Sequence, residues 1–304
     1  MTSLRLGTRG SALALWQANH VASLISPIID PRPVELVRID THGDRDQASA
    51  LSAMGGFGVF TKAIQQALLD GVADAAVHSL KDLPTIPVEG VELVATPERA
   101  PNGDAFISTK HTRFDDLPPG ATIGTSSLRR RAQLLNHRPD LKLVELRGNV
   151  DTRLRKLEEQ GLDGIVLAEA GLVRLGLAHK ITEILDPGWM LPAVGQGAIG
   201  LECRTADGTT REILEAINHR ETWSRVRAER AMLWTLGGGC LVPIGATSRI
   251  ENGELIVRGA VLSEDGRRRI VATHRGVPDT PLAVGQELAA MLKDEGAEEL
   301  LTNH

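Results

Sequence analysis

The hydrophobic and polar positions in the first third of the chain alternate between the period of a strand and the period of a helix. Four short apolar segments are typical of buried strands: residues 4–6, 34–39, 74–78 and 92–96. Two amphipathic stretches between them predict helices, at residues 12–24 and 61–69. Ser11 is the expected N-cap of the first helix, and Gly71 the expected end of the second. Strands separated by helices predict a largely parallel, doubly wound sheet.

The same alternation returns after a turn-rich stretch at residues 97–103. Four further segments are strand-like: residues 105–108, 121–124, 142–146 and 164–168. Ser126 or Ser127 is the expected N-cap of a helix between them, and Asn149 that of a helix over residues 150–160. After a second turn-rich stretch at residues 191–197, we expect the apolar segment 199–203 to return to the first sheet.

The last part of the chain has a different pattern. We predict a helix at residues 221–236 and a final helix at residues 281–295. Three strand-like segments lie between these helices: residues 245–250, 254–263 and 269–274. Asn252-Gly253 and Asp265-Gly266 separate the strands and are hairpin signals, so we expect an antiparallel sheet.

Together these patterns predict an α/β fold with two doubly wound lobes and a C-terminal α+β domain that contains a three-stranded antiparallel sheet. The predicted domains are residues 1–97 with 198–217, residues 103–191, and residues 220–304. Residues 98–102 and 192–197 are the predicted hinges, because two strands that cross between two lobes make a compact cleft.

Composition places limits on the compartment. Of the 304 residues, 42% are hydrophobic and 24% are charged, which excludes disorder as the default state. Two cysteines cannot hold together a chain of this length, and no CxxC pair is present, so we expect a reducing, cytoplasmic setting. The first residues lack the pattern of a signal peptide, and we expect no apolar run near the roughly 18 residues of a membrane helix.

Charge changes the picture of the ligand. With 34 basic and 39 acidic residues the net charge is −5, and the chain has no Tyr, so we expect no nucleic-acid partner. Because we expect no apolar run of membrane length, we also expect no membrane partner. Basic residues are nevertheless concentrated between Gly124 and Lys156, a stretch that contains nine Lys or Arg and only three acidic residues. This concentration predicts a small ligand with several anionic groups.

Both predicted lobes place a strand, a turn with hydroxyl groups and a helix start at corresponding points, in residues 7–11 and 124–130. Helix N-termini bind anions, and arginines add bidentate recognition of carboxylate or phosphate. Arg147 and Arg153 flank another predicted helix start in the same way. The alternative is that the hydroxyl groups only cap helices and that the arginines form a solvated face.

Ser79, Lys81 and Asp82 follow a predicted strand within four residues. Their spacing leaves two alternatives open. Lys81 and Asp82 could form an incidental surface ion pair. Otherwise Asp82 could stabilise a cationic intermediate or manage a proton, while Lys81 holds a substrate carboxylate.

The two cysteines have different surroundings. Cys203 ends an apolar segment and is expected to be buried and inert. Cys240 follows three glycines, which favours a presented thiol that serves as a nucleophile or a covalent attachment point. The nine histidines lack metal-ligand spacing, so no metal site is predicted.

Taken in order along the chain, these motifs closely resemble the porphobilinogen deaminase family. The matching blocks are residues 8–11, 14–17, 76–82, 124–130, 146–149, 170–176, 191–198 and 238–240. The resemblance implies two lobes like those of a periplasmic binding protein, and a monomer. It also implies a transferase that joins four porphobilinogen molecules head to tail, releases ammonia each time and then hydrolyses off hydroxymethylbilane.

The resemblance further implies a dipyrromethane cofactor, built from porphobilinogen and linked through a thioether to Cys240. Asp82 would be the catalytic residue, which accepts pyrrole N–H bonds and offsets the charge of an azafulvenium-like cation. The positions that match the family's binders of cofactor and substrate carboxylates are Arg9, Arg129, Arg130, Arg147, Arg153, Arg174, Lys81, Ser79, Thr125, Ser127 and Gln17.

The chain departs from the family pattern in two places. Ala53 and Phe57 stand where the family usually has lysines, which puts the charge of that loop in doubt. Gly237 stands where a Glu is common, and we expect a more mobile loop around Cys240 as a result. The competing hypothesis for the whole chain is a non-catalytic, two-lobed protein that binds a polycarboxylate.

Overall fold

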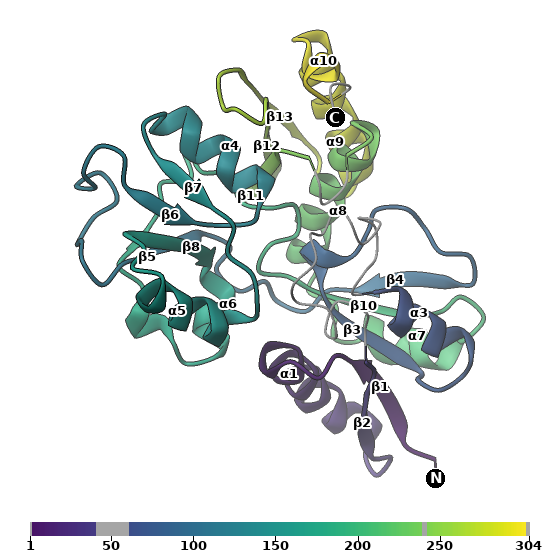
Figure 1. The fold of residues 1–304 in the computed structure, drawn as a ribbon. Helices are drawn as coiled ribbons and strands as arrows, with labels where there is room; N and C mark the ends of the chain where they lie inside the picture. The colour runs from purple at the N-terminus through teal and green to yellow at the C-terminus, as the bar shows by residue number, and fades with distance from the viewer. Residues whose placement is uncertain (1, 41–60, 239–241, 302–304) are drawn as a thin grey trace. The chain divides into compact units, whose positions relative to one another are not determined.

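The computed structural model describes residues 2–40, 61–238 and 242–301. The chain divides into two compact units (Figure 1). Unit 1 consists of residues 1–100 and 198–223, and unit 2 of residues 101–197 and 224–304.

Unit 1 is built on a five-stranded sheet with the order β2-β1-β3-β10-β4. Its strands are β1 (Leu4–Thr8), β2 (Val34–Arg38), β3 (Ala75–Ser79), β4 (Val91–Ala95) and β10 (Ile199–Arg204). β1 pairs in parallel with β2 and β3, whereas β10 runs antiparallel to both β3 and β4. The predicted return of the segment after residue 197 to the first sheet is confirmed.

The described helical segments of unit 1 include α1 (Ala12–Ile29), α3 (Lys62–Leu69), the 3₁₀ turn η1 (Leu80–Asp82) and α7 (Gly208–Glu215). The Ser11 hydroxyl accepts a hydrogen bond from the Ala14 backbone N–H at 3.3 Å, so the predicted N-cap is confirmed. Gly71 follows α3 with a φ of 67°, the left-handed conformation in which glycine ends a helix.

α1 requires one correction. Its 18 residues have a mean hydropathy of 1.2, and by length and composition alone it could cross a membrane. The expectation that no segment approaches a membrane helix is therefore wrong on these two measures. In unit 1, Ala18, Val21 and Ile25 of α1 are fully buried in a core that includes strand residues of β1, β3 and β10.

The first sheet of unit 2 has the order β7-β6-β8-β5-β9. Its strands are β5 (Asp104–Ile107), β6 (Thr122–Gly124), β7 (Lys142–Val144), β8 (Gly164–Ala168) and β9 (Glu183–Ile184). β6 is parallel to β7 and β8, and β5 is antiparallel to β8 and β9. Each five-stranded sheet therefore has one strand that opposes the other four.

The helical segments that accompany this sheet are α4 (Leu128–His137), α5 (Val150–Glu159), α6 (Glu169–Arg174) and the 3₁₀ turn η2 (Ala178–Lys180). Ser127 caps α4 by accepting from the Arg130 N–H, and Asn149 caps α5 by accepting from the Thr152 N–H. Both caps were predicted, and Ser127 rather than Ser126 is the N-cap of α4.

The C-terminal part of unit 2 contains an antiparallel sheet in the order β11-β12-β13. Its elements are α8 (Arg220–Thr235), β11 (Ile244–Glu251), β12 (Glu254–Leu262), β13 (Arg269–Gly276), α9 (Pro281–Asp294) and the unpredicted α10 (Ala297–Leu301). Asn252 and Gly253 have φ values of 52° and 81°, which confirms the hairpin between β11 and β12. Met232, Val257 and Leu288 share the apolar core of this part.

The predicted fold class is confirmed: two doubly wound α/β lobes with five-stranded sheets, and an α+β part with a three-stranded antiparallel sheet. Ala132 of α4, Leu191 and Leu262 of β12 lie in one buried cluster, so the second sheet and the C-terminal part share unit 2. The finer division into three domains with hinges at residues 98–102 and 192–197 stays a prediction.

Candidate functional site

The predicted site residues of unit 1 lie at the carboxyl ends of neighbouring strands. Arg9 directly follows β1, while Ser79 ends β3 and leads into η1, which carries Lys81 and Asp82. Because β1 and β3 pair in parallel, both ends reach the same edge of the sheet. Arg9, Ser79, Lys81 and Asp82 are all half-buried there. The structure therefore brings these four predicted residues to one sheet edge.

Gln17 joins this edge from α1. Its side chain is buried, and its amide exchanges hydrogen bonds with the Ser79 hydroxyl, with Nε2 to Oγ at 2.9 Å and Oγ to Oε1 at 3.1 Å. This pair ties the first helix to the end of β3, one turn before Asp82. Both residues were predicted as binders, and their mutual bond fixes the orientation of each.

In unit 2, the loops after β6 and β7 lie side by side because the two strands are parallel. Thr125, which is buried, donates its backbone N–H to the Val144 carbonyl at 2.9 Å. The Ser126 hydroxyl accepts from the Leu146 N–H at 3.0 Å and donates to the Leu146 carbonyl at 2.8 Å. Ser126 thus holds the loop that contains Arg147. The sequence pattern offered Ser126 only as a possible helix cap and did not indicate this role.

Arg147 and Arg153 are both anchored in this loop. The Arg147 Nε donates to Glu145 Oε1 at 2.5 Å, and the Arg153 Nε donates to the Gly148 carbonyl at 2.7 Å. Gly148 has a φ of 111°, which an L side chain rarely adopts, so the turn between the two arginines requires glycine. The two guanidiniums are therefore carried on one rigid turn and the helix that follows it.

Arg174 lies at the end of α6 and is buried. One of its terminal nitrogens donates to the Gly197 carbonyl at 2.7 Å. Burial lowers the pKa of Arg174 to about 10, because a charged group loses solvation in the interior. The side chain still carries its positive charge at neutral pH.

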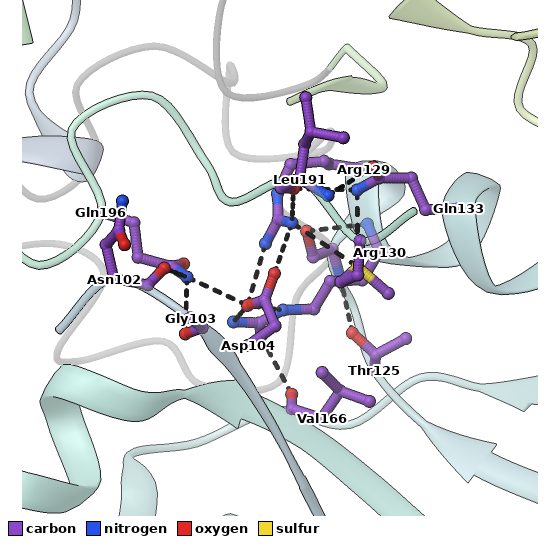
Figure 2. A network of polar contacts seen from close by, with 12 residues as sticks. Asn102, Gly103, Asp104, Thr125, Arg129, Arg130, Gln133, Val166, Leu191 and Gln196 are labelled. Carbon is purple, nitrogen blue, oxygen red and sulfur yellow. Dashed lines mark hydrogen bonds and ion pairs between the residues drawn. The ribbon is translucent and has the colours of Figure 1, made fainter. Parts of the chain in front are cut away.

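Arg129 and Arg130, the first basic pair of α4, share one carboxylate (Figure 2). Asp104 Oδ2 accepts from Arg129 Nη1 at 2.6 Å, and Oδ1 accepts from Arg130 Nη2 at 2.6 Å and Nε at 2.9 Å. Arg129 Nη1 also donates to the Leu191 carbonyl at 2.5 Å, and Arg130 Nη1 donates to the Val166 carbonyl at 2.9 Å. The sequence pattern identified both arginines and missed Asp104.

Asp104 is fully buried, and each arginine is 5% exposed. Burial by itself would raise the pKa of Asp104, but the two guanidiniums hold it well below its usual range. Burial also lowers the pKa of Arg130 from its ordinary value, against the attraction of Asp104. The only sequence signal for Asp104 is its position directly after the turn-rich stretch at residues 97–103.

The structure describes one of the two cysteines and neither of the positions where lysines are usual in the family. Cys203 is fully buried, which raises the pKa of its thiol to about 11, so the prediction of a core cysteine is confirmed. Cys240, Ala53 and Phe57 lie outside the described residues. In the part of the chain that the structure describes, no group of three or more His, Cys, Asp or Glu side chains could hold a metal ion.

Two of the three glycines before Cys240, Gly237 and Gly238, lie among the described residues and have structural roles. Gly237 follows α8 with a φ of 68° and donates its N–H to the Trp234 carbonyl, and Gly238 donates to the Leu233 carbonyl. A β-carbon on Gly238 would lie 2.6 Å from Leu233 Cδ1. Gly237 therefore ends the helix and Gly238 permits close packing, whereas the greater mobility expected of the next residues stays a prediction.

Mixed α/β sheets that carry cationic side chains at their strand ends are typical of proteins that bind anionic small molecules. Within that class, the chain belongs to the porphobilinogen deaminase family. The family model described as "Porphobilinogen deaminase, dipyromethane cofactor binding domain" matches residues 4–212, and the model of the family's C-terminal domain matches residues 223–294.

Curated relatives match over nearly the full length. The porphobilinogen deaminase of Pelobacter propionicus is 47% identical over 298 residues, which cover 98% of this chain and 96% of the relative. The porphobilinogen deaminase of Geobacter sulfurreducens is 48% identical over 301 residues, which cover 99% of this chain and 94% of the relative. Family membership implies a transferase and favours the enzyme over the non-catalytic binding protein.

Solved structures with a related fold include the methionine-binding protein MetQ, at 14% identity and a TM-score of 0.47, with 71% of this chain and 89% of that chain covered. A periplasmic substrate-binding protein of an ABC transporter from Coxiella burnetii has 17% identity and a TM-score of 0.45, with 70% of this chain and 91% of that chain covered.

Proposed function

We propose that the chain joins four porphobilinogen molecules head to tail with loss of ammonia and then releases hydroxymethylbilane by hydrolysis. The proposal is supported by family membership over residues 4–212 and 223–294. The structural observation that carries it is the gathering of cationic side chains at the strand ends of each five-stranded sheet. A monomeric state and a cytoplasmic location belong to the same proposal.

The substrate explains why so many cations are needed. Each porphobilinogen unit has an acetate and a propionate, so a growing chain presents two more carboxylates at every step. Arg147 stands on the turn before α5 and Arg153 on the first turn of α5, and bidentate guanidinium–carboxylate pairs give both strength and orientation. We assign these arginines to the carboxylates of substrate and product chain, together with Arg9 and Lys81 at the sheet edge of unit 1.

The described residues of unit 2 fit the dipyrromethane group named by the family model. Arg129 and Arg130 are buried beside a single carboxylate, so the cluster retains positive charge for an acidic group. Thr125 and Ser127 add hydroxyl groups at the same end of β6. When bound, the group supplies the pyrrole carbon to which the first substrate unit is joined. We propose its thioether link to Cys240, which follows the helix end at Gly237.

Asp82 is proposed to accept the pyrrole N–H bonds of the bound substrate. Loss of ammonia leaves positive charge on the substrate, and a fixed carboxylate close to it stabilises that charge without reorganisation of solvent. The half-buried position of Asp82 in η1, directly after β3, supports this role. Because the bond between Gln17 and Ser79 anchors the strand end, η1 starts from a fixed point.

Intact mass spectrometry tests the covalent group. The purified chain is expected to exceed its sequence mass by two linked pyrrole units, and Cys240→Ala is expected to lose that excess. Cys203→Ala is the matched control and should keep it, because Cys203 is buried in the core of unit 1. A wild-type chain that is active without the added mass would contradict the cofactor assignment.

Turnover of Asp82→Asn tests the catalytic assignment. We expect a loss of about 100-fold or more with an unchanged melting temperature, because the variant keeps the shape of the side chain and removes its charge. Asp70→Asn, at the exposed end of α3, is the control and should turn over like the wild type. Near-normal turnover of Asp82→Asn would remove Asp82 from the reaction.

Arg147→Leu tests carboxylate binding. The variant should raise KM and change the distribution of intermediate chain lengths, because one guanidinium contact is lost at each elongation step. Arg155→Leu serves as the control, because Arg155 lies on α5, the helix that follows the Arg147 loop, with a 67% exposed side chain. An unchanged distribution of intermediates would count against Arg147.

A further inference from the structure

Asp104 connects two cationic residues assigned to the ligand, Arg129 and Arg130, with the rest of unit 2. Its carboxylate accepts five hydrogen bonds, from Arg129, Arg130 and Gln196, at distances from 2.6 to 3.2 Å. A fully buried carboxylate with every bond made to side chains is a rigid acceptor, because none of its partners can exchange for water.

This arrangement determines the direction of both guanidiniums. Arg129 is held between Asp104 Oδ2 and the Leu191 carbonyl, and Arg130 is held between Asp104 Oδ1 and the Val166 carbonyl. Guanidinium groups are planar, so two fixed partners on each define the plane and leave the remaining N–H groups pointing in set directions. A displacement of the Asp104 carboxylate would therefore turn both arginines together.

The charges in the cluster are unequal. Two guanidiniums face one carboxylate, so the three groups carry one net positive charge in a site that is nearly closed to water. Buried charge without a counterion is costly, and a single ligand carboxylate would compensate it. With a second carboxylate in the cluster the net charge would be zero, and without Asp104 it would be two positive charges. Asp104 therefore sets the net charge of the cluster at one.

Gln196 connects the same carboxylate to the two segments predicted as hinges. Its Nε2 donates to Asp104 Oδ1 at 3.1 Å and to the Asn102 and Gly103 carbonyls at 2.9 and 3.0 Å (Figure 2). Residue 196 lies in the later segment and residue 102 in the earlier one. The amide thus fixes the start of β5, where Asp104 lies, against the chain that returns to unit 1.

We infer that Asp104 is the positioning residue of the cofactor site: it orients Arg129 and Arg130 and leaves them one positive charge for a single ligand carboxylate. The inference rests on the proposed function and assigns Asp104 no contact with the reacting atoms. Gln196 also helps to hold Asp104 in place, because its side-chain amide donates to the carboxylate without changing the charge of the cluster.

The test compares Asp104→Glu and Asp104→Asn with Asp140→Asn. Asp140 also accepts two bonds from one arginine, Arg138, but it is partly exposed and belongs to no assigned site. Each chain is prepared without the cofactor and mixed with porphobilinogen at increasing concentrations. Intact mass spectrometry then gives the rate of cofactor loading, the half-saturating concentration and the final loaded fraction, while a thermal melt gives stability.

Asp104→Glu keeps the charge and moves the carboxylate by one methylene. We expect the half-saturating concentration of porphobilinogen to rise about tenfold or more, because a modest loss of binding free energy has an effect of this size. Asp140→Asn should load like the wild type. Loss of stability alone would lower the folded fraction without moving the half-saturating concentration. A normal half-saturating concentration for Asp104→Glu would overturn the inference.

Asp104→Asn leaves two buried positive charges and could fail to fold. Asp104→Asn with Arg130→Gln returns the cluster to one positive charge, and we expect the double variant to fold but to load with a raised half-saturating concentration. Normal loading of the double variant would also overturn the inference. A wild-type chain that takes up no added mass would instead overturn the proposed function itself, so the two failures are distinct.

Discussion

Gly285 marks the place where α9 crosses α8 in the C-terminal part of unit 2. A β-carbon added there would lie 2.2 Å from the Ala228 carbonyl oxygen, 2.8 Å from Ala231 Cβ and 2.9 Å from the Met232 backbone nitrogen. A relaxed contact between carbon and a carbonyl oxygen is about 3.3 Å. Gly285→Ala therefore requires the two helices to separate by about 1 Å at their crossing.

Two effects oppose each other in this variant. Alanine in place of glycine inside a helix contributes about 1 kcal/mol of stability through backbone entropy. Overpacking a closed core costs about 1–3 kcal/mol and occasionally more. Two of the three obstructing atoms, the Ala228 oxygen and the Met232 nitrogen, belong to the backbone of α8, and the β-carbon of Ala231 cannot rotate away either. The cost of overpacking therefore lies near the upper end of its range and exceeds the gain in backbone entropy. We expect a net loss of about 1–2 kcal/mol.

For a unit of this size, such a loss lowers the melting temperature by about 2–8 °C. Thermal unfolding followed by circular dichroism measures the change. Gly208→Ala is the matched control, because Gly208 begins α7 and no atom lies within 4 Å of its added β-carbon. A Gly285→Ala chain that melts at or above the wild-type temperature would refute the clash argument.

Three further outcomes are expected. Cys203 should resist alkylation by iodoacetamide at pH 7 until denaturant is added, because burial raises the pKa of its thiol to about 11 and keeps it protonated; rapid native alkylation in Cys240→Ala would contradict this. Asn149→Ala should lower the free energy of unfolding by about 1 kcal/mol in urea titrations, since it removes the α5 cap. The guanidiniums hold the pKa of Asp104 below its ordinary value of about 3.9 despite burial, so its stabilisation is present above that pH and is lost as the pH falls further. The acid-induced fall in melting temperature should therefore be smaller in the double variant Asp104→Asn with Arg130→Gln, which is expected to fold, and equal slopes would contradict the assignment.

The sequence by itself determined most of the elements of this protein and the identity of the cationic residues. Ser11, Ser127 and Asn149 cap the helices that their positions predicted, and Cys203 is in the core, as its apolar neighbours indicated. These features depend on residues within a turn or two along the chain, so periodicity and capping rules contain the necessary information. The family motifs likewise identified Arg129 and Arg130 by their order in the chain.

Only the tertiary structure decided how these residues are held. Asp104 is 25 residues from Arg129 along the chain, and Gln196 is 92 residues from Asp104. They meet because β5 runs antiparallel within the second sheet and places its first residue beside the start of α4. Strand order also decided that the apolar face of the 18-residue helix α1 packs on a sheet. A contact between distant segments depends on which strands become neighbours, and the local pattern of hydrophobic and polar residues does not determine that order.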